Sequence, residues 1–226
     1  MTPFLIFATQ RSGSTFFVEA LRREHAVRCL FEVLNDAQYP RWLGAQLNFT
    51  SHSDAMRQLP IFMSHFWSDW CPSSLEEMVA CGFKVLADHL RPPAHLDQLF
   101  QSGSPRVILL ERSDARAQYA SLSRAFATGE WGFEADVATK QQVCQPADEE
   151  CKHRVAAAFS WTPGAGAAGS FKAFLRAREA WHSNVRRAAT RAGSPLLLVH
   201  SESLNDTHTL NATMTRVLRF LRRPAI

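Results

Sequence analysis

The stretch FLIFATQRSGST (Phe4–Thr15) decides the fold, because a continuous apolar run of strand length meets a polar turn that contains glycine. The residues that follow repeat apolar side chains at helical spacing, so the segment predicts a strand, a loop and a helix. The same order recurs at RVILL (Arg106–Leu110), which is followed by a helical pattern that ends near Gly129.

Further segments continue this alternation of strands and helices. Short strands are expected in GFKVLADHL (82–90) and PLLLVHSESL (195–204), and helices in residues 170–193 and 213–221. Strands that are apolar throughout and alternate with helices are typical of a parallel sheet covered on both faces. We therefore predict one α/β domain over residues 1–226, a P-loop-like three-layer sandwich, with a mobile excursion at 134–169.

Composition indicates a globular protein with a substantial core, since 46% of the 226 residues are hydrophobic. The net charge is only +4, but lysine occurs at just four positions, so 21 of the 25 basic residues are arginine. Arginine presents a planar fork that fits phosphate or sulfate, and the skew is compatible with an anionic ligand. A GC-rich, alanine-rich coding sequence is the alternative explanation, and composition alone does not identify a function.

The cysteines and asparagines bear on the cellular compartment. Cys144 and Cys151 bracket a polar loop, which fits either a local disulfide or two free thiols, and no C-x-x-C pair occurs. Three of the five asparagines stand in glycosylation sequons, at Asn48, Asn205 and Asn211. There is no membrane-length apolar run and no signal-peptide pattern. These features predict a Golgi or secretory luminal domain if an anchor exists outside this chain, and a cytoplasmic protein otherwise.

The loop after the first strand has the features of a phosphate cradle. Gly13 permits a tight turn, the amides of residues 12–16 can point inward, and the following helix adds its positive end. A serine-rich helix cap is the alternative interpretation. The loop lacks the lysine of G-x-x-x-x-G-K-[ST], which counts against a P-loop kinase.

Two segments carry a resemblance to a known family. FATQRSGSTFF resembles the 5′-phosphosulfate-binding loop of sulfotransferases that use 3′-phosphoadenosine-5′-phosphosulfate (PAPS). VILLERSDARAQYASLSRA is similar to the segment that holds the 3′-phosphate in this family, with Arg112 and Ser121 at the matching positions. The QYASL run and Trp131 are closer to the bacterial and carbohydrate-directed branch, and weaker agreements extend the resemblance over residues 4–221.

The resemblance implies PAPS as donor, 3′-phosphoadenosine-5′-phosphate (PAP) as product, and no metal. The acceptor would be a hydroxyl or amine of a carbohydrate or small metabolite, and the excursion at 134–169 would lie near its site. We expect this chain to contact neither nucleic acid nor a membrane. The sequence leaves open whether the protein forms an oligomer. The implied donor-binding residues are Arg11, Ser12, Gly13, Ser14, Thr15, Phe16, Arg112 and Ser121.

Sulfuryl transfer needs a cation over the bridging oxygen and a base for the acceptor. The implied cation is Arg11, which would stabilise the leaving phosphate, and the implied general base is Glu32 in CLFEVLN, where related enzymes place a carboxylate. Its apolar neighbours predict partial desolvation and a raised proton affinity. Alternative bases are His65, His89 and His200, while Lys84 and Asp88 are expected to do no more than contact the acceptor.

Two departures from the family pattern stand out. The chain ends at residues 222–226, where many members continue into a glycine-rich and basic loop that closes over the nucleotide. Glu111 precedes Arg112 and is expected to point away from a phosphate. A P-loop kinase and a non-catalytic relative that binds a polyanion are the competing interpretations, although basic residues are scattered along the chain instead of clustered.

Overall fold

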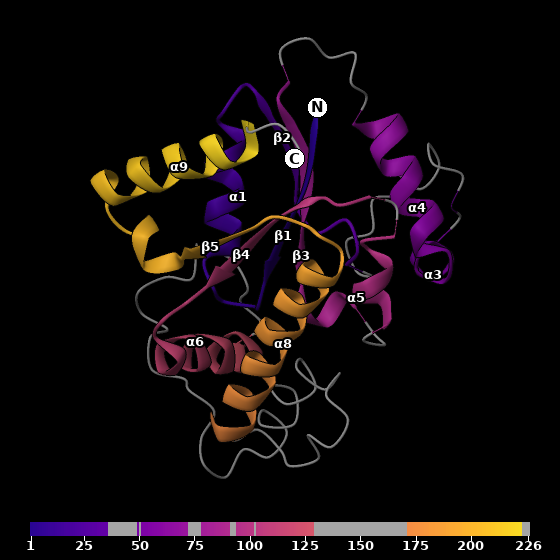
Figure 1. The fold of residues 1–226 in the computed structure, drawn as a ribbon. Coiled ribbons are helices and arrows are strands. Elements are labelled where there is room, and N and C mark those ends of the chain that lie inside the picture. The colour runs from indigo at the N-terminus through magenta and orange to yellow at the C-terminus, as the bar shows by residue number, and fades with distance from the viewer. Residues whose placement is uncertain are drawn as a thin grey trace.

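A five-stranded parallel sheet forms the centre of the protein, in the order β2-β3-β1-β4-β5 (Figure 1). The computed structural model describes residues 1–35, 49, 51–71, 78–90, 94–101, 103–128 and 171–222. The strands are β1 (Thr2–Ala8), β2 (Val27–Leu30), β3 (Ala80–Leu86), β4 (Arg106–Glu111) and β5 (Leu196–His200). The predicted α/β sandwich around a parallel sheet is confirmed.

Helices cover both faces of this sheet, which explains why its central strands are apolar throughout. In β1, Phe4 and Ile6 pack on one side, while Leu5 and Phe7 pack on the other. The first side is covered by α1 (Ser14–Arg22) and α9 (Thr207–Arg222) (Figure 1). The second side is covered by α3 (His52–Arg57), α4 (Leu59–His65), α5 (Ala94–Gln98) and α8 (Phe171–Arg191).

The remaining elements are the helix α6 and three short helical turns. α6 (Ala115–Thr128) packs on α8, whereas β3 and β5 run into single turns of 3₁₀-helix, η3 (Ala87–His89) and η5 (Ser201–Leu204). A π-helical turn, η2 (Phe66–Trp70), follows α4. The predicted strands and helices are all present, but β2 and α3 to α5 were not foreseen, since four to seven residues are too few for periodicity to separate helix from strand. The predicted excursion at 134–169 lies outside the described residues.

A disulfide joins Cys71, at the end of η2, to Cys81 in β3. Sequence analysis did not foresee this pair, and the proposed Cys144–Cys151 pair lies outside the described residues. The Arg28 guanidinium lies 3.8 Å from the ring centroid of Trp70 and donates to its carbonyl at 3.0 Å, so η2 is fixed to the sheet at two places. The disulfide therefore ties the helical segment 51–71 to a central strand.

Removing this disulfide should lower the free energy of unfolding by about 2 to 3 kcal/mol, because the cross-link closes a short loop in the unfolded chain. Urea unfolding of the Cys71→Ala/Cys81→Ala double variant measures the loss. Dithiothreitol should destabilise the wild type by a similar amount and leave this variant unchanged. A double variant as stable as the oxidised wild type would contradict the prediction.

On the surface, two of the three sequon asparagines, Asn205 and Asn211, are exposed beside and within α9, and Asn48 lies outside the described residues. A search of the helices in the described ranges finds none with the length and apolar character to cross a membrane. Cys29 is buried in the sheet, and burial raises the pKa of its thiol to about 12.

Candidate functional site

The chain reverses its direction of travel across the sheet between the neighbouring strands β1 and β4. β1 leads through α1 to β2 on one side, while β4 leads on through α6 and α8 to β5 on the other (Figure 1). Such a reversal opens a crevice beyond the carboxyl ends of the two strands, which is where α/β sheets bind ligands. The loop at residues 9–13 and the residue Arg112 both follow these strand ends.

The backbone of the loop after β1 turns sharply twice. Gly13 has φ +78° and precedes α1 as its N-cap, and Arg11 has φ +59°, which for a non-glycine residue costs about 1 to 2 kcal/mol. Hydrogen bonds within α1 begin with the Phe17 amide, which donates to the Gly13 carbonyl at 3.1 Å. The amides before it therefore lie at the positive end of a helix that has no acidic residue in its first turn.

Two arginines and a serine from the predicted motifs come together at this loop. Arg11 Nε donates to Ser121 Oγ at 2.9 Å, across 110 residues of chain, and Arg112 Nη1 donates to the Arg11 carbonyl at 3.2 Å. Burial lowers the pKa of Arg11, and the charges of Arg112 and Arg124 lower it further. The positive charges of Arg112 and Arg124 repel the Arg11 guanidinium, and a bound anion would offset that repulsion.

Contacts from η5 and α8 hold the turn that contains Arg112. Glu202 Oε1, in η5, accepts hydrogen bonds from the amides of Ser113 (2.9 Å) and Asp114 (3.2 Å) at the start of α6. The buried Arg178 of α8 donates to the Arg112 carbonyl.

Glu111, the residue before Arg112, directs its carboxylate toward α8. It lies 3.3 Å from His182 Nδ1 and pairs with Arg186. Its carboxylate is thus engaged by α8, and the expectation that Glu111 points away from a bound phosphate stays a prediction.

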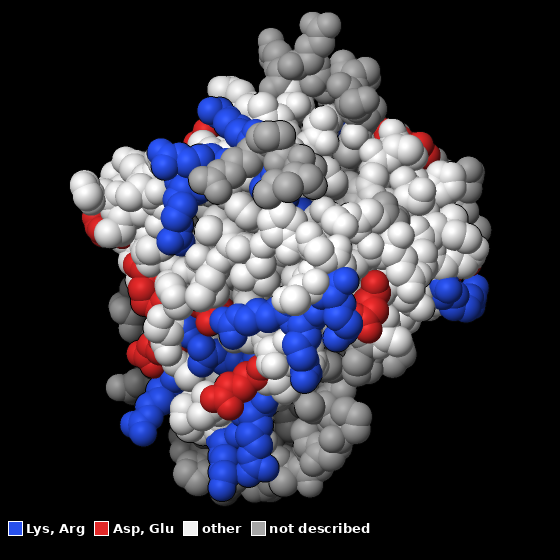
Figure 2. All heavy atoms as spheres, in the orientation of Figure 1, with Lys and Arg blue, Asp and Glu red and all other residues white. Residues whose placement is uncertain are grey.

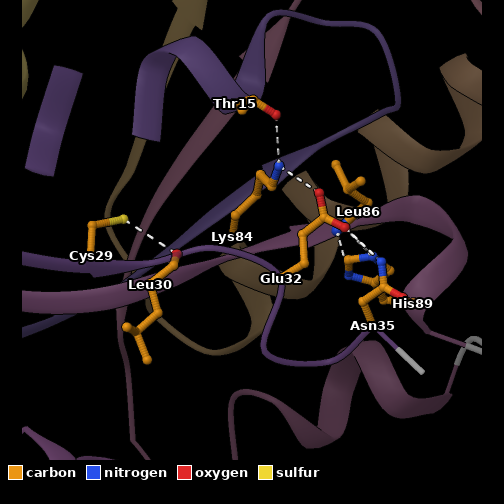
Figure 3. Close-up of polar contacts among 8 residues, drawn as sticks. All are labelled: Thr15, Cys29, Leu30, Glu32, Asn35, Lys84, Leu86 and His89. Carbon is orange, nitrogen blue, oxygen red and sulfur yellow. Dashed lines mark hydrogen bonds and ion pairs between the residues drawn. The ribbon is translucent and has the colours of Figure 1, made fainter. Parts of the chain in front are cut away.

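Glu32 forms the centre of a second polar cluster beside the loop (Figure 3). Its Oε1 lies 2.6 Å from Nζ of Lys84, a β3 residue whose side chain is only 1% exposed. Its Oε2 accepts from Asn35 Nδ2 at 2.7 Å and lies 3.4 Å from His89 Nε2. Lys84 Nζ also donates to Thr15 Oγ1 at 3.3 Å, so one ammonium group joins Glu32 to the first turn of α1 (Figure 3).

The electrostatics of Glu32 differ from the sequence-based expectation. Burial alone would raise the pKa of its carboxyl, but the contacts with His89, Lys84 and Asn35 outweigh burial and lower that pKa to about 2. The prediction of a raised proton affinity is therefore wrong for this state of the protein. An apolar flanking sequence does not reveal that an ammonium group lies against the carboxylate.

The three histidines considered as alternative bases have different surroundings. His65 faces Asp69 on the surface, and His200 lies 3.3 Å from the Ser113 hydroxyl, both away from Glu32. His89 Nδ1 accepts from the Leu86 amide at 3.2 Å, so the ring proton of the neutral form is on Nε2 and points toward Glu32. In this arrangement Nδ1 of His89 is occupied by the Leu86 amide, and Nε2 lies 3.4 Å from the Glu32 carboxylate without a hydrogen bond to any described residue. His89 is therefore not placed to accept a proton from an acceptor.

Gln118 and Arg124 are site residues to which sequence reasoning gave no role, and for Lys84 it expected no more than contact with the acceptor, not the pairing with Glu32. Gln118 and Arg124 lie three residues before and after Ser121, so helical spacing alone places all three on one face of α6. That spacing could have been read from the sequence. The pairing of Lys84 with Glu32 could not, because it depends on how the segment after β2 turns back over β3.

Basic and acidic side chains alternate over α8 on the face seen in Figure 2, and they do not merge into one continuous basic surface there. The cations that converge in the described part of the chain are instead those at the loop. Their arrangement could hold an anion beside the buried carboxylate–lysine pair of Glu32 and Lys84. Comparison with protein-family models finds no match for this chain, and a search of curated proteins finds none either.

Proposed function

We propose that this protein is a sulfotransferase that moves the sulfuryl group of PAPS to a hydroxyl or amine of an acceptor, such as a carbohydrate or a small metabolite. The observation that carries the proposal is the 2.9 Å hydrogen bond from Arg11 to Ser121. It joins the two segments that resemble the 5′- and 3′-phosphate sites of PAPS-dependent enzymes. They meet where the chain reverses across the sheet, the expected position for a nucleotide.

In the proposed mechanism, the amides and hydroxyls at residues 12–16 hold the 5′-phosphate, and Arg112 and Ser121 hold the 3′-phosphate. The acceptor oxygen or nitrogen attacks sulfur as the bond from sulfur to the bridging oxygen breaks, and PAP leaves with the negative charge. Arg11 stabilises that charge with its guanidinium. Catalysis then consists mainly of positioning and charge stabilisation, as in phosphoryl transfer.

Glu32 is the proposed general base, and its contact with Lys84 sets a condition on that role. A carboxylate whose pKa is about 2 is ionised at neutral pH but accepts a proton weakly. Lys84 also contacts Thr15 at the loop, so a donor bound there would compete for the ammonium group. Movement of Lys84 toward the donor would raise the proton affinity of Glu32 when the acceptor arrives.

Binding of nucleotides separates this proposal from its rivals. Titration calorimetry should detect PAP, with ATP and Mg²⁺ bound at least about tenfold more weakly, and radiolabelled PAPS should transfer sulfate to a member of an acceptor panel. Tight binding of ATP with Mg²⁺ and none of PAP would favour the kinase. Binding of heparin without PAP would favour the polyanion-binding relative.

Arg112→Ala should weaken the binding of PAP by about tenfold or more while changing that of adenosine 5′-phosphate less than threefold, because a charge-assisted contact to the 3′-phosphate is lost. Arg116→Ala, at an exposed position of α6, is the matched control and should leave both affinities unchanged. Equal weakening of both nucleotides by Arg112→Ala would place this residue away from the 3′-phosphate.

A further inference from the structure

We propose that Gln118 is a positioning residue that holds the loop at residues 9–13 in its anion-binding conformation. Gln118 lies in α6 and is completely buried, with an exposed fraction of 0%. Its Nε2 donates to two groups of the loop, the Thr9 hydroxyl and the Gln10 carbonyl, each at 2.7 Å. Thr9 and Gln10 are the two residues before Arg11, the residue with the left-handed backbone.

The orientation of the Gln118 amide follows from its partners. A backbone carbonyl can only accept a hydrogen bond, so the atom that faces Gln10 must be the NH₂ group. Within the described ranges, no hydrogen-bond donor reaches the buried Gln118 Oε1. Burying an amide with one unsatisfied end is unfavourable, so its donation to the loop is the interaction that accounts for a glutamine at this position.

Gln118 and Ser121 hold the loop from the same face of α6, one helical turn apart. Gln118 donates to the residues before Arg11, and the Arg11 side chain in turn donates to Ser121. The strained φ of Arg11 is thereby fixed on both sides. α6 thus sets the direction of the loop amides as well as supplying Ser121.

This inference rests on the proposed function for the identity of the anion, the 5′-phosphate of an adenosine nucleotide. The role of Gln118 in the loop conformation does not depend on that identity. A loop released from α6 would hold the 5′-phosphate less well, while Arg112, held by η5 and α8, would keep its place. The expected signature is a selective loss at one end of the nucleotide.

Gln118→Met tests this, because methionine keeps the length of the side chain and removes the NH₂ donor. We expect amide hydrogen exchange at residues 10–14 to accelerate at least about tenfold, with the affinity for adenosine 5′-phosphate reduced about tenfold and that for adenosine 3′-phosphate changed less than twofold. Thr9→Val removes only one of the two acceptors and should give a smaller effect in the same direction. Arg116→Gln, on the exposed side of α6, should change none of these.

Unchanged exchange at residues 10–14 in Gln118→Met would overturn the inference, as would equal loss of both nucleotide affinities, which would indicate a general effect on the fold. If Gln118→Met does not fold, Thr9→Val decides by the same two measurements. A wild-type protein that binds neither nucleotide would refute the proposed function instead. Hydrogen exchange at the loop would then still decide the role of Gln118.

Discussion

Replacing Arg11 with alanine is expected to lower the turnover of sulfuryl transfer by at least about a hundredfold, while the protein stays folded. The Arg11 guanidinium donates a hydrogen bond to Ser121, and the Arg11 carbonyl accepts one from Arg112. Arg11 therefore lies between the two proposed phosphate sites. In the proposed mechanism, the Arg11 charge stabilises the transition state, in which the bridging oxygen becomes negative, more than it stabilises the bound donor. Turnover should therefore fall more than donor affinity.

Radiolabelled sulfate transfer at saturating PAPS measures this effect. Arg11→Lys keeps a charge but lacks the planar fork, so its turnover should lie between those of wild type and Arg11→Ala. Arg57→Ala, whose side chain is 73% exposed, is the control for loss of one arginine and should transfer sulfate normally. Turnover within threefold of wild type in Arg11→Ala would remove Arg11 from the catalytic role.

Glu32→Gln is expected to lower turnover by at least about a hundredfold, since it removes the proposed base. It should also destabilise the fold by about 3 to 5 kcal/mol, because the buried Lys84 ammonium loses its carboxylate partner. The double variant Glu32→Gln/Lys84→Met should recover most of this stability and none of the activity. Wild-type transfer by Glu32→Gln would eliminate Glu32 as base, and full stability would mean that the Lys84 pair contributes little.

The same pair makes stability depend on pH in a defined direction. The folded protein holds the pKa of Glu32 at about 2, below its ordinary value of 4.5, so the folded state favours the ionised carboxylate. This contribution is complete above about pH 4.5 and is lost as the pH falls toward 2. The difference in unfolding free energy between wild type and Glu32→Gln, measured in urea at pH 6, 4 and 3, should shrink by up to about 3 kcal/mol over the range from pH 4.5 to 2.

The sequence predicted the parallel sheet, because its strands depend on strong local signals. The apolar runs of β1 and β4 identify buried strands, and neighbouring parallel strands bring Arg11 and Arg112 to one edge of the sheet. The surroundings of Glu32 were not predictable in this way. They depend on Lys84, a residue inside β3 whose side chain contacts Glu32, 52 positions earlier in the chain. No local sequence pattern reveals a contact between residues so far apart.

The disulfide escaped prediction for a related reason. Cys71 and Cys81 stand ten positions apart and match no cysteine motif, and their pairing follows from the position of η2 beside β3. The left-handed backbone of Arg11 was likewise hidden, because arginine has no preference for positive φ. Gly13 was foreseen, since glycine is the residue that such a turn favours.

The position of β1 in the middle of the sheet has a consequence for how the protein is made. The ribosome delivers the loop at residues 9–13 before its partners: Arg112 and Ser121 emerge about a hundred residues later, and η5, which lies beside Gly13, emerges later still. Pairings between such distant segments form slowly. A nascent chain therefore carries this loop long before the residues that contact it emerge, and the proposed donor site would be complete only once β5 and η5 have emerged.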